Sequence, residues 1–112
     1  MKPRLAYIDH ALRYVGCFLM RMRIEEGIEI TAAESLEDFL KDHDLNDFSV
    51  LLYHPGRKKQ YLIPEVKKRF PHLRVAGITA PGSQQDYLPS DEFPMFTYNA
   101  KHRIAEFVRG NQ

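Results

Sequence analysis

Short apolar runs alternate with amphipathic segments along most of this chain, and the most distinct run lies near the middle. Residues 50–53 are all apolar or aromatic, with Asn46-Asp47 shortly before them and Pro55-Gly56 after. A short apolar run bounded by turn-forming residues is typical of a fully buried strand. The pattern therefore predicts a central strand that presents Tyr53 and His54 at its carboxyl end.

Four further segments have the pattern of strands. The first, residues 5–8, is followed directly by Asp9 and His10, and the others are residues 28–32, 73–80 and 93–98. The weakly alternating, β-branched segment 28–32 suits a more exposed strand. Pro94 lies at the start of the last segment and has no backbone donor, which is typical of the edge of a sheet.

Apolar residues at helical spacing fill the intervals between the first four strands. Segment 11–26 repeats them three or four positions apart and is followed by Gly27, a favourable residue for ending a helix. We expect Cys17 to pack in the core from this helix. Ser35 is a favourable N-cap for a second helix, and Pro64 fits the first turn of a third.

The last part of the chain is less regular. Residues 83–91 include Pro89 and show little apolar periodicity, so we expect the helix between the fourth and fifth strands to be short or missing. Asn99 is expected to cap a final helix that ends at Gly110.

Buried strands that alternate with amphipathic helices indicate a parallel sheet with helices on both faces. Right-handed crossovers leave few arrangements of such a sheet. We expect one α/β domain over residues 1–112, a flavodoxin-like three-layer sandwich whose five-stranded parallel sheet has the order 2-1-3-4-5. That order makes the first and third strands neighbours, so their carboxyl ends would bring together Asp9, His10, Tyr53 and His54.

Composition excludes several classes of protein. The 112 residues are 44% hydrophobic and 28% charged with a formal net charge of +1, so no overall charge attracts nucleic acid or an anionic membrane. A single cysteine cannot form an internal disulfide. No apolar run is long enough to span a bilayer and the first residues lack the pattern of a signal peptide, so we expect a cytoplasmic protein.

The charges are divided along the sequence. Residues 25–47 contain nine acids and one base, Lys41, whereas six of the sixteen basic residues gather near the third predicted helix. These six residues are Arg57, Lys58, Lys59, Lys67, Lys68 and Arg69. Solvated helix faces are the simplest explanation of such runs. The basic group is also a candidate contact patch for a charged partner or, less favoured, for nucleic-acid phosphates.

The chain resembles a response-regulator receiver domain of the CheY-like type over nearly its whole length. The resemblance rests on Ile8-Asp9 after the first strand, on the run 48–52, and on Gly77-Ile78-Thr79-Ala80 at the end of the fourth. It implies a two-component signal-transduction module in which an aspartate accepts a phosphoryl group. It also implies Mg²⁺ held by an acidic pair, a hydroxyl after the fourth strand and a lysine after the fifth.

Two of the implied acidic positions lack an acid. The nucleophile position falls on Tyr53, or on His54 if the register shifts by one residue, and the second acid of the pair falls on His10. Aspartyl phosphorylation requires a carboxylate nucleophile and oxygen ligands for a hard cation.

The lysine position also departs from the pattern, because it lands near Tyr98, with Lys101 close by but inside the last predicted helix. Only Asp9 and Thr79 match the family cleanly. We therefore expect a degenerate receiver, or pseudo-receiver, that has lost aspartyl phosphorylation. Its altered pocket would comprise Asp9, His10, Tyr53, His54, Thr79 and Lys101.

Two imidazoles and one carboxylate, from His10, His54 and Asp9, are ligands that suit a transition metal. They lie on two separate strand ends without a His-x-x-x-His spacing, and hydrogen bonds from the histidines to Asp9 explain them without an ion. The sequence thus predicts neither a metal site nor a cofactor.

Two interpretations of function follow. The favoured one is a non-enzymatic interaction module that acts through protein–protein contacts, including self-association. The alternative is a small α/β enzyme or ligand-binding domain that uses Asp9, His10 and His54 in the crevice at the strand ends.

Overall fold

The structure, a computed structural model, describes residues 3–56, 59–81 and 93–110. The strands are β1 (Arg4–Asp9), β2 (Glu29–Ala33), β3 (Val50–His54), β4 (Arg74–Thr79) and β5 (Met95–Thr97). The helices are α1 (Gly16–Glu25), α2 (Leu36–Asp42), α3 (Leu62–Arg69) and α4 (Lys101–Arg109), with one-turn 3₁₀ segments at Leu12–Tyr14 and Leu45–Asp47. Arg57, Lys58 and residues 83–91, where we expected a short or missing helix, lie outside the described residues.

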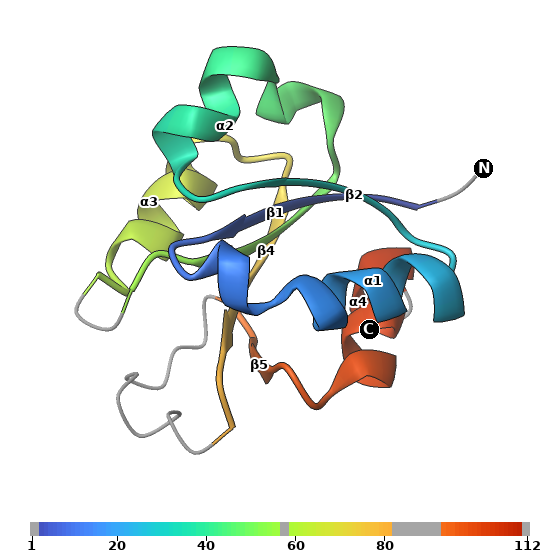
Figure 1. Cartoon of the computed structure of the whole chain (residues 1–112). Helices are drawn as coiled ribbons and strands as arrows, with labels where there is room; N and C mark the ends of the chain where they lie inside the picture. The colour runs from blue at the N-terminus through green and yellow to red at the C-terminus, as the bar shows by residue number, and fades with distance from the viewer. Residues whose placement is uncertain (1–2, 57–58, 82–92, 111–112) are drawn as a thin grey trace.

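The strands form one sheet in the order β2-β1-β3-β4-β5, and every neighbouring pair is parallel (Figure 1). The predicted flavodoxin-like order is therefore confirmed. In the register of β1 and β3, Asp9 pairs with His54 and Ile8 pairs with Tyr53. The register thus sets Asp9 beside His54 at the carboxyl edge of the sheet.

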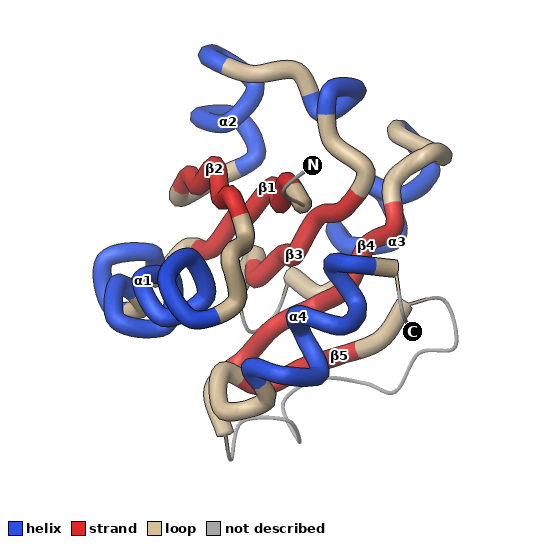
Figure 2. Tube along the Cα trace, turned by 90° about the vertical axis from the view of Figure 1, so that its right-hand side faces the viewer, coloured by secondary structure: helices blue, strands red, loops and turns tan. Residues whose placement is uncertain are grey.

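Two hydrophobic clusters cover the two faces of the sheet. In Figures 1 and 2, α1 and α4 lie on one face and α2 and α3 on the other. Tyr7 and Leu52 belong to the cluster under α1 and α4, whereas Ile8 and Tyr53 belong to the cluster under α2 and α3. Side chains alternate between faces along a strand. Asp9 and His54 therefore continue the α1–α4 face, and Tyr53 points to the opposite one.

Most of the residues that we expected to cap or end a helix do so in the structure. Ser35 Oγ accepts the Asp38 N–H at 3.1 Å, as expected of an N-cap. Gly27 and Gly110 have φ values of 66° and 84°, which favour glycine after a helix. The prediction for Asn99 is wrong: α4 begins after Ala100 without a side-chain cap, because the Asn99 amide oxygen accepts the Thr97 hydroxyl instead.

The first helix differs from the prediction in its start and its phase. A 3₁₀ turn precedes it, so α1 begins at Gly16 rather than near residue 11. Cys17 is exposed rather than in the core, because Leu19 and Met22 are the helix residues that face the sheet. The opposite side presents a second row of apolar and thiol groups, which we call the α1 outer stripe: Tyr14, Cys17, Met20 and Ile24.

Within the described part of the chain, none of the helices combines the length and the apolar character needed to cross a bilayer.

Candidate functional site

A buried carboxylate is the centre of the carboxyl edge of the sheet. Asp9 is 0% exposed and accepts the hydroxyl of Tyr7 at 2.8 Å and that of Tyr98 at 2.6 Å, both on Oδ2. Its Oδ1 accepts the Ala11 N–H at 2.9 Å and lies 3.1 Å from His54 Nδ1. Four donors from three separate segments thus converge on one carboxylate.

The hydrogen-bond pattern assigns the tautomer of His54. An ionised carboxylate only accepts hydrogen bonds, so His54 Nδ1 carries the hydrogen that it shares with Asp9. His54 Nδ1 also lies 3.0 Å from the Tyr98 oxygen, which accepts this contact because the Tyr98 hydroxyl hydrogen points to Asp9. His54, Tyr98 and Asp9 therefore form a closed triangle of hydrogen bonds.

The ionisation of these groups follows from their contacts. Burial alone would raise the pKa of Asp9, but the hydrogen bonds from His54, Tyr98, the Ala11 backbone and Tyr7 outweigh burial and lower it. Burial, and then the nearby Asp9 charge, raise the pKa of Tyr7 far above its usual value. The site is thus a carboxylate ion surrounded by neutral hydroxyl donors.

His10 completes the site from the solvent side. Its Nδ1 lies 3.8 Å from Asp9 Oδ1, and its ring meets the His54 ring edge to face, with 4.6 Å between centroids. A side chain at Gly56, whose φ is +123°, would begin 3.7 Å from the His10 ring. The backbone N–H of His10 also bonds to the His54 carbonyl at 3.0 Å. This bond holds the His10 backbone beside the end of β3 and so keeps the residue next to the carboxylate.

The other expected pocket residues take different positions. Thr79 is buried at the end of β4, where its carbonyl accepts the Tyr98 N–H. Lys101 lies in the first turn of α4 and pairs with Glu25 Oε2 at 2.8 Å, away from Asp9. Tyr98 thus takes the place next to the carboxylate where the resemblance implies a lysine.

Tyr53 does not join Asp9. It is 5% exposed within the cluster under α2 and α3, and with His10 it lines a separate cavity of about 410 Å³. Of the two residues that the sequence left open for the nucleophile position, His54 is the one that contacts Asp9. Sequence reasoning missed Tyr7 as a donor to Asp9, although a residue two positions earlier on a strand shares its face.

An apolar cavity of about 370 Å³ adjoins the site on the α1 side. It is lined mainly by aromatic and aliphatic groups, with His54 and Tyr98 on its wall: Ala11, Tyr14, Val15, Phe18, His54, Ala80 and Tyr98. The cavity therefore connects the polar triangle to the exposed end of the α1 outer stripe at Tyr14.

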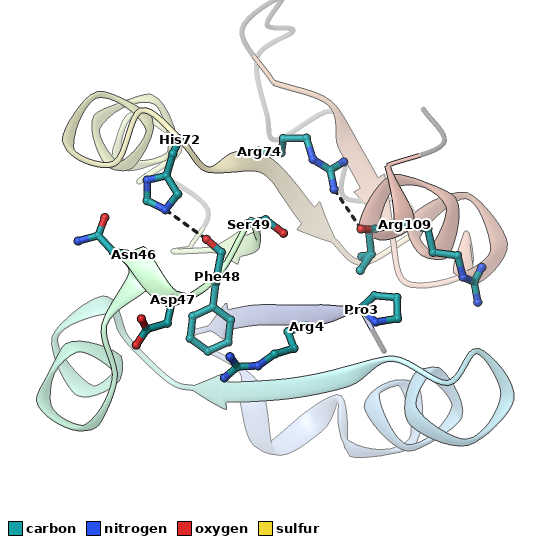
Figure 3. Close-up of a pocket in the computed structure, with 10 residues that line it drawn as sticks. Pro3, Arg4, Asn46, Asp47, Phe48, Ser49, His72, Arg74 and Arg109 are labelled. Atoms are coloured by element: carbon teal, nitrogen blue, oxygen red, sulfur yellow. Dashed lines mark hydrogen bonds between the residues drawn. The ribbon is translucent and has the colours of Figure 1, made fainter. Parts of the chain in front are cut away.

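A larger cavity, of about 720 Å³, opens at the opposite edge of the sheet, where the strands begin (Figure 3). Its basic groups are engaged within the fold: the Arg4 guanidinium lies 4.7 Å from the centroid of the Phe48 ring, and the others contact main-chain groups. Arg74 donates to the carbonyls of Phe107 and Val108 at the end of α4, and His72 Nε2 lies 3.2 Å from the Phe48 carbonyl. Arg109 donates to the Glu26 carbonyl at 2.7 Å. These contacts connect neighbouring elements of the fold, which indicates a structural role for the basic residues that line this cavity.

Only part of the predicted basic patch is described. Lys67 donates to the Leu73 carbonyl, and the Arg69 guanidinium lies 5.3 Å from the centroid of the Phe70 ring. Lys59, before α3, and Lys68, within it, are both exposed. Two of the four described cations are thus occupied by contacts within the fold.

The site does not suit the Mg²⁺ that the resemblance implies. Mg²⁺ prefers oxygen ligands in an octahedral arrangement. Here one carboxylate with four hydrogen-bond donors faces two imidazoles. The register position next to Asp9 on β3 is held by His54, which is not a carboxylate.

Known proteins resemble this chain in fold. A receiver domain protein from Clostridium thermocellum has 18% identity and a TM-score of 0.67, with 96% of this chain and 92% of that chain covered. A response regulator from Thermotoga maritima has 15% identity and a TM-score of 0.66, with 99% and 98% covered. A CheY-like receiver domain protein from Methanospirillum hungatei JF-1 has 13% identity and a TM-score of 0.67, with 99% and 97% covered.

No protein-family model and no curated protein sequence matches the chain.

Proposed function

Because the chain has the fold of response-regulator receiver domains, we propose that it is a receiver-like signalling module that no longer accepts a phosphoryl group on aspartate and acts, without enzymatic activity, through protein–protein contacts. One observation carries this proposal: the hydroxyl of Tyr98 and the imidazole of His54 occupy the carboxylate of Asp9. The family reaction needs a second carboxylate, Mg²⁺ and a lysine around that group.

Mg²⁺ is expected to leave the melting temperature of the protein unchanged, both alone and with acetyl phosphate. A ligand that binds only the folded state raises its stability in proportion to the logarithm of its concentration, so binding would be visible in a thermal titration. Sodium chloride at matched ionic strength is the control. A rise in melting temperature that follows Mg²⁺ but not sodium would contradict the proposal.

The α1 outer stripe supports the protein-contact part of the proposal. Tyr14 is 74% exposed, Met20 52% and Ile24 75%, whereas the helix buries Leu19 and Met22 on its other side. A helix with apolar residues on both sides exposes one of these sides to water in the monomer. Association with a partner buries that side, which is favourable.

A second copy of this chain is the partner that we propose for the stripe. Antiparallel pairing about a two-fold axis brings the Tyr14 end of one copy against the Ile24 end of the second copy, so the same apolar patch covers itself. Glu25, near the Ile24 end, already pairs with Arg21 and Lys101 of its own chain, and the proposed contact therefore rests on apolar surface.

Ile24→Asp is expected to weaken this self-association by about tenfold or more, because it places a charge among apolar groups that the contact would bury. Sedimentation velocity over a range of concentrations measures the effect. Tyr61→Asp, at a residue 60% exposed before α3, is the matched control and should leave association unchanged. A monomer at every concentration, or an assembly that is insensitive to Ile24→Asp, would contradict this partner.

The cavity of about 370 Å³ favours one alternative function, the binding of a small apolar ligand beside Asp9 and His54. Such a ligand would contact Phe18 and Tyr98 and raise the melting temperature. A thermal-shift screen of the wild type, with Phe18→Ala as the comparison, separates ligand binding from the protein-contact function. A screen without any rise in melting temperature would exclude ligand binding for the compounds that were tested.

A further inference from the structure

The geometry points to a site for a borderline divalent metal, Zn²⁺ or Ni²⁺, formed by Asp9, His10 and His54, and we propose that the protein binds one such ion there. One donor atom from each of the three residues lies within 4.8 Å of the other two. This inference goes beyond the proposed function and does not depend on it.

The distances between the donor atoms fit a small tetrahedral ion. Ligands at 2.0–2.1 Å from Zn²⁺ in a tetrahedron lie about 3.3 Å from one another. Asp9 Oδ1 is 3.1 Å from His54 Nδ1 and 3.8 Å from His10 Nδ1, and the three donor atoms all lie within 4.8 Å of one another. Asp9 and His54 are therefore already at the distance that the ion requires, and the half-exposed His10 ring moves toward them to complete the site.

The surroundings hold the carboxylate and the exposed ligand as a metal site requires. The hydroxyls of Tyr7 and Tyr98 both bind Asp9 Oδ2, which fixes the carboxylate and turns Oδ1 toward the imidazoles. The backbone N–H of His10 bonds to the His54 carbonyl at 3.0 Å, which holds the two histidine ligands next to each other. The ligands thus come from the ends of two neighbouring strands and from the residue that follows the first of them.

Binding of the ion requires a change of tautomer at His54. The neutral imidazole carries its hydrogen on Nδ1, so this hydrogen moves to Nε2 when the ion takes Nδ1, and the ring keeps one proton throughout. Three protein ligands leave a fourth position for water. Two imidazoles and one carboxylate favour Zn²⁺ or Ni²⁺ over Mg²⁺, which explains why the same edge of the sheet can exclude the hard cation and still hold a metal.

Calorimetric titration of the untagged, metal-free full chain with ZnCl₂ and, separately, with MgCl₂ tests the proposal. We expect one equivalent of Zn²⁺ to bind and Mg²⁺ not to bind. His10→Ala, at a half-exposed position, and His54→Ala should each weaken Zn²⁺ binding by about tenfold or more. His102→Ala is the matched control, since His102 is 81% exposed on α4 and lies 3.4 Å from Glu26, which makes it a competing surface ligand.

Co²⁺ provides a second readout, because four-coordinate Co²⁺ absorbs strongly in the visible and six-coordinate Co²⁺ does not. The proposal predicts the four-coordinate spectrum in the wild type and in His102→Ala, and its loss in His10→Ala. Absence of Zn²⁺ binding, or binding that His10→Ala leaves unchanged and His102→Ala abolishes, would overturn the site. The loss of aspartyl phosphorylation is tested without Zn²⁺, so failure here leaves the proposed function untouched.

Discussion

Replacing Asp9 with alanine is expected to lower the free energy of unfolding by about 2–4 kcal/mol. The change leaves the hydroxyl of Tyr7, a fully buried residue, without its acceptor and removes the hydrogen bonds from Tyr98, His54 and the Ala11 N–H. Urea unfolding followed by circular dichroism at pH 7 measures the loss. Asp42→Ala, at an exposed position at the end of α2, is the control and should change stability by less than about 0.5 kcal/mol.

The destabilisation should also depend on pH. The pKa of Asp9 is lowered in the folded state, so its carboxylate contributes stability above the unfolded pKa of about 3.9 and loses it as the pH falls through the folded value. The difference between wild type and Asp9→Ala should therefore shrink as the pH falls below about 4. A difference that does not shrink below about pH 4 would contradict the lowered pKa of Asp9.

Restoring the family residues is expected to restore the family reaction. The triple variant His10→Asp, His54→Asp and Tyr98→Lys replaces two imidazoles with carboxylates and a hydroxyl donor with an ammonium group next to Asp9. These changes supply the oxygen ligands for Mg²⁺ and the nucleophile that the wild type lacks. Intact mass after incubation with acetyl phosphate and Mg²⁺ should then show a phosphoryl adduct on the variant.

A control variant carries the same chemical changes on the surface: His43→Asp, His102→Asp and Tyr61→Lys. Circular dichroism and urea unfolding establish that both triple variants are folded before they are treated. A folded, Mg²⁺-binding variant that takes up no phosphoryl group would show that these three positions do not account for the loss. Labelling of the surface control would show that the adduct is non-specific.

The fold could be predicted from the sequence because its strands are continuous apolar runs. Residues 5–8 and 50–53 are apolar at every position and all are buried, as expected of strands with both faces covered, and their alternation with helices then indicates a parallel sheet. The helix ends were predictable where one residue decides them, as at Ser35 and Gly110.

The site could be predicted only in part, because it depends on single-residue register and on helix phase. Whether Tyr53 or His54 meets Asp9 is decided by which side of β3 each residue takes, and a shift of one residue exchanges them. The position of Tyr98 over Asp9 joins residues 89 positions apart. The expectation that Cys17 is in the core failed for a related reason, since α1 has apolar residues on both sides.

Intact-mass spectrometry of the wild-type chain after incubation with acetyl phosphate and Mg²⁺, beside the restored triple variant, tests the central claim most directly. The account predicts an unmodified mass for the wild type under conditions that label the restored variant. A stable phosphoryl adduct on the wild type, mapped by fragmentation to the Asp9 carboxylate, would contradict it.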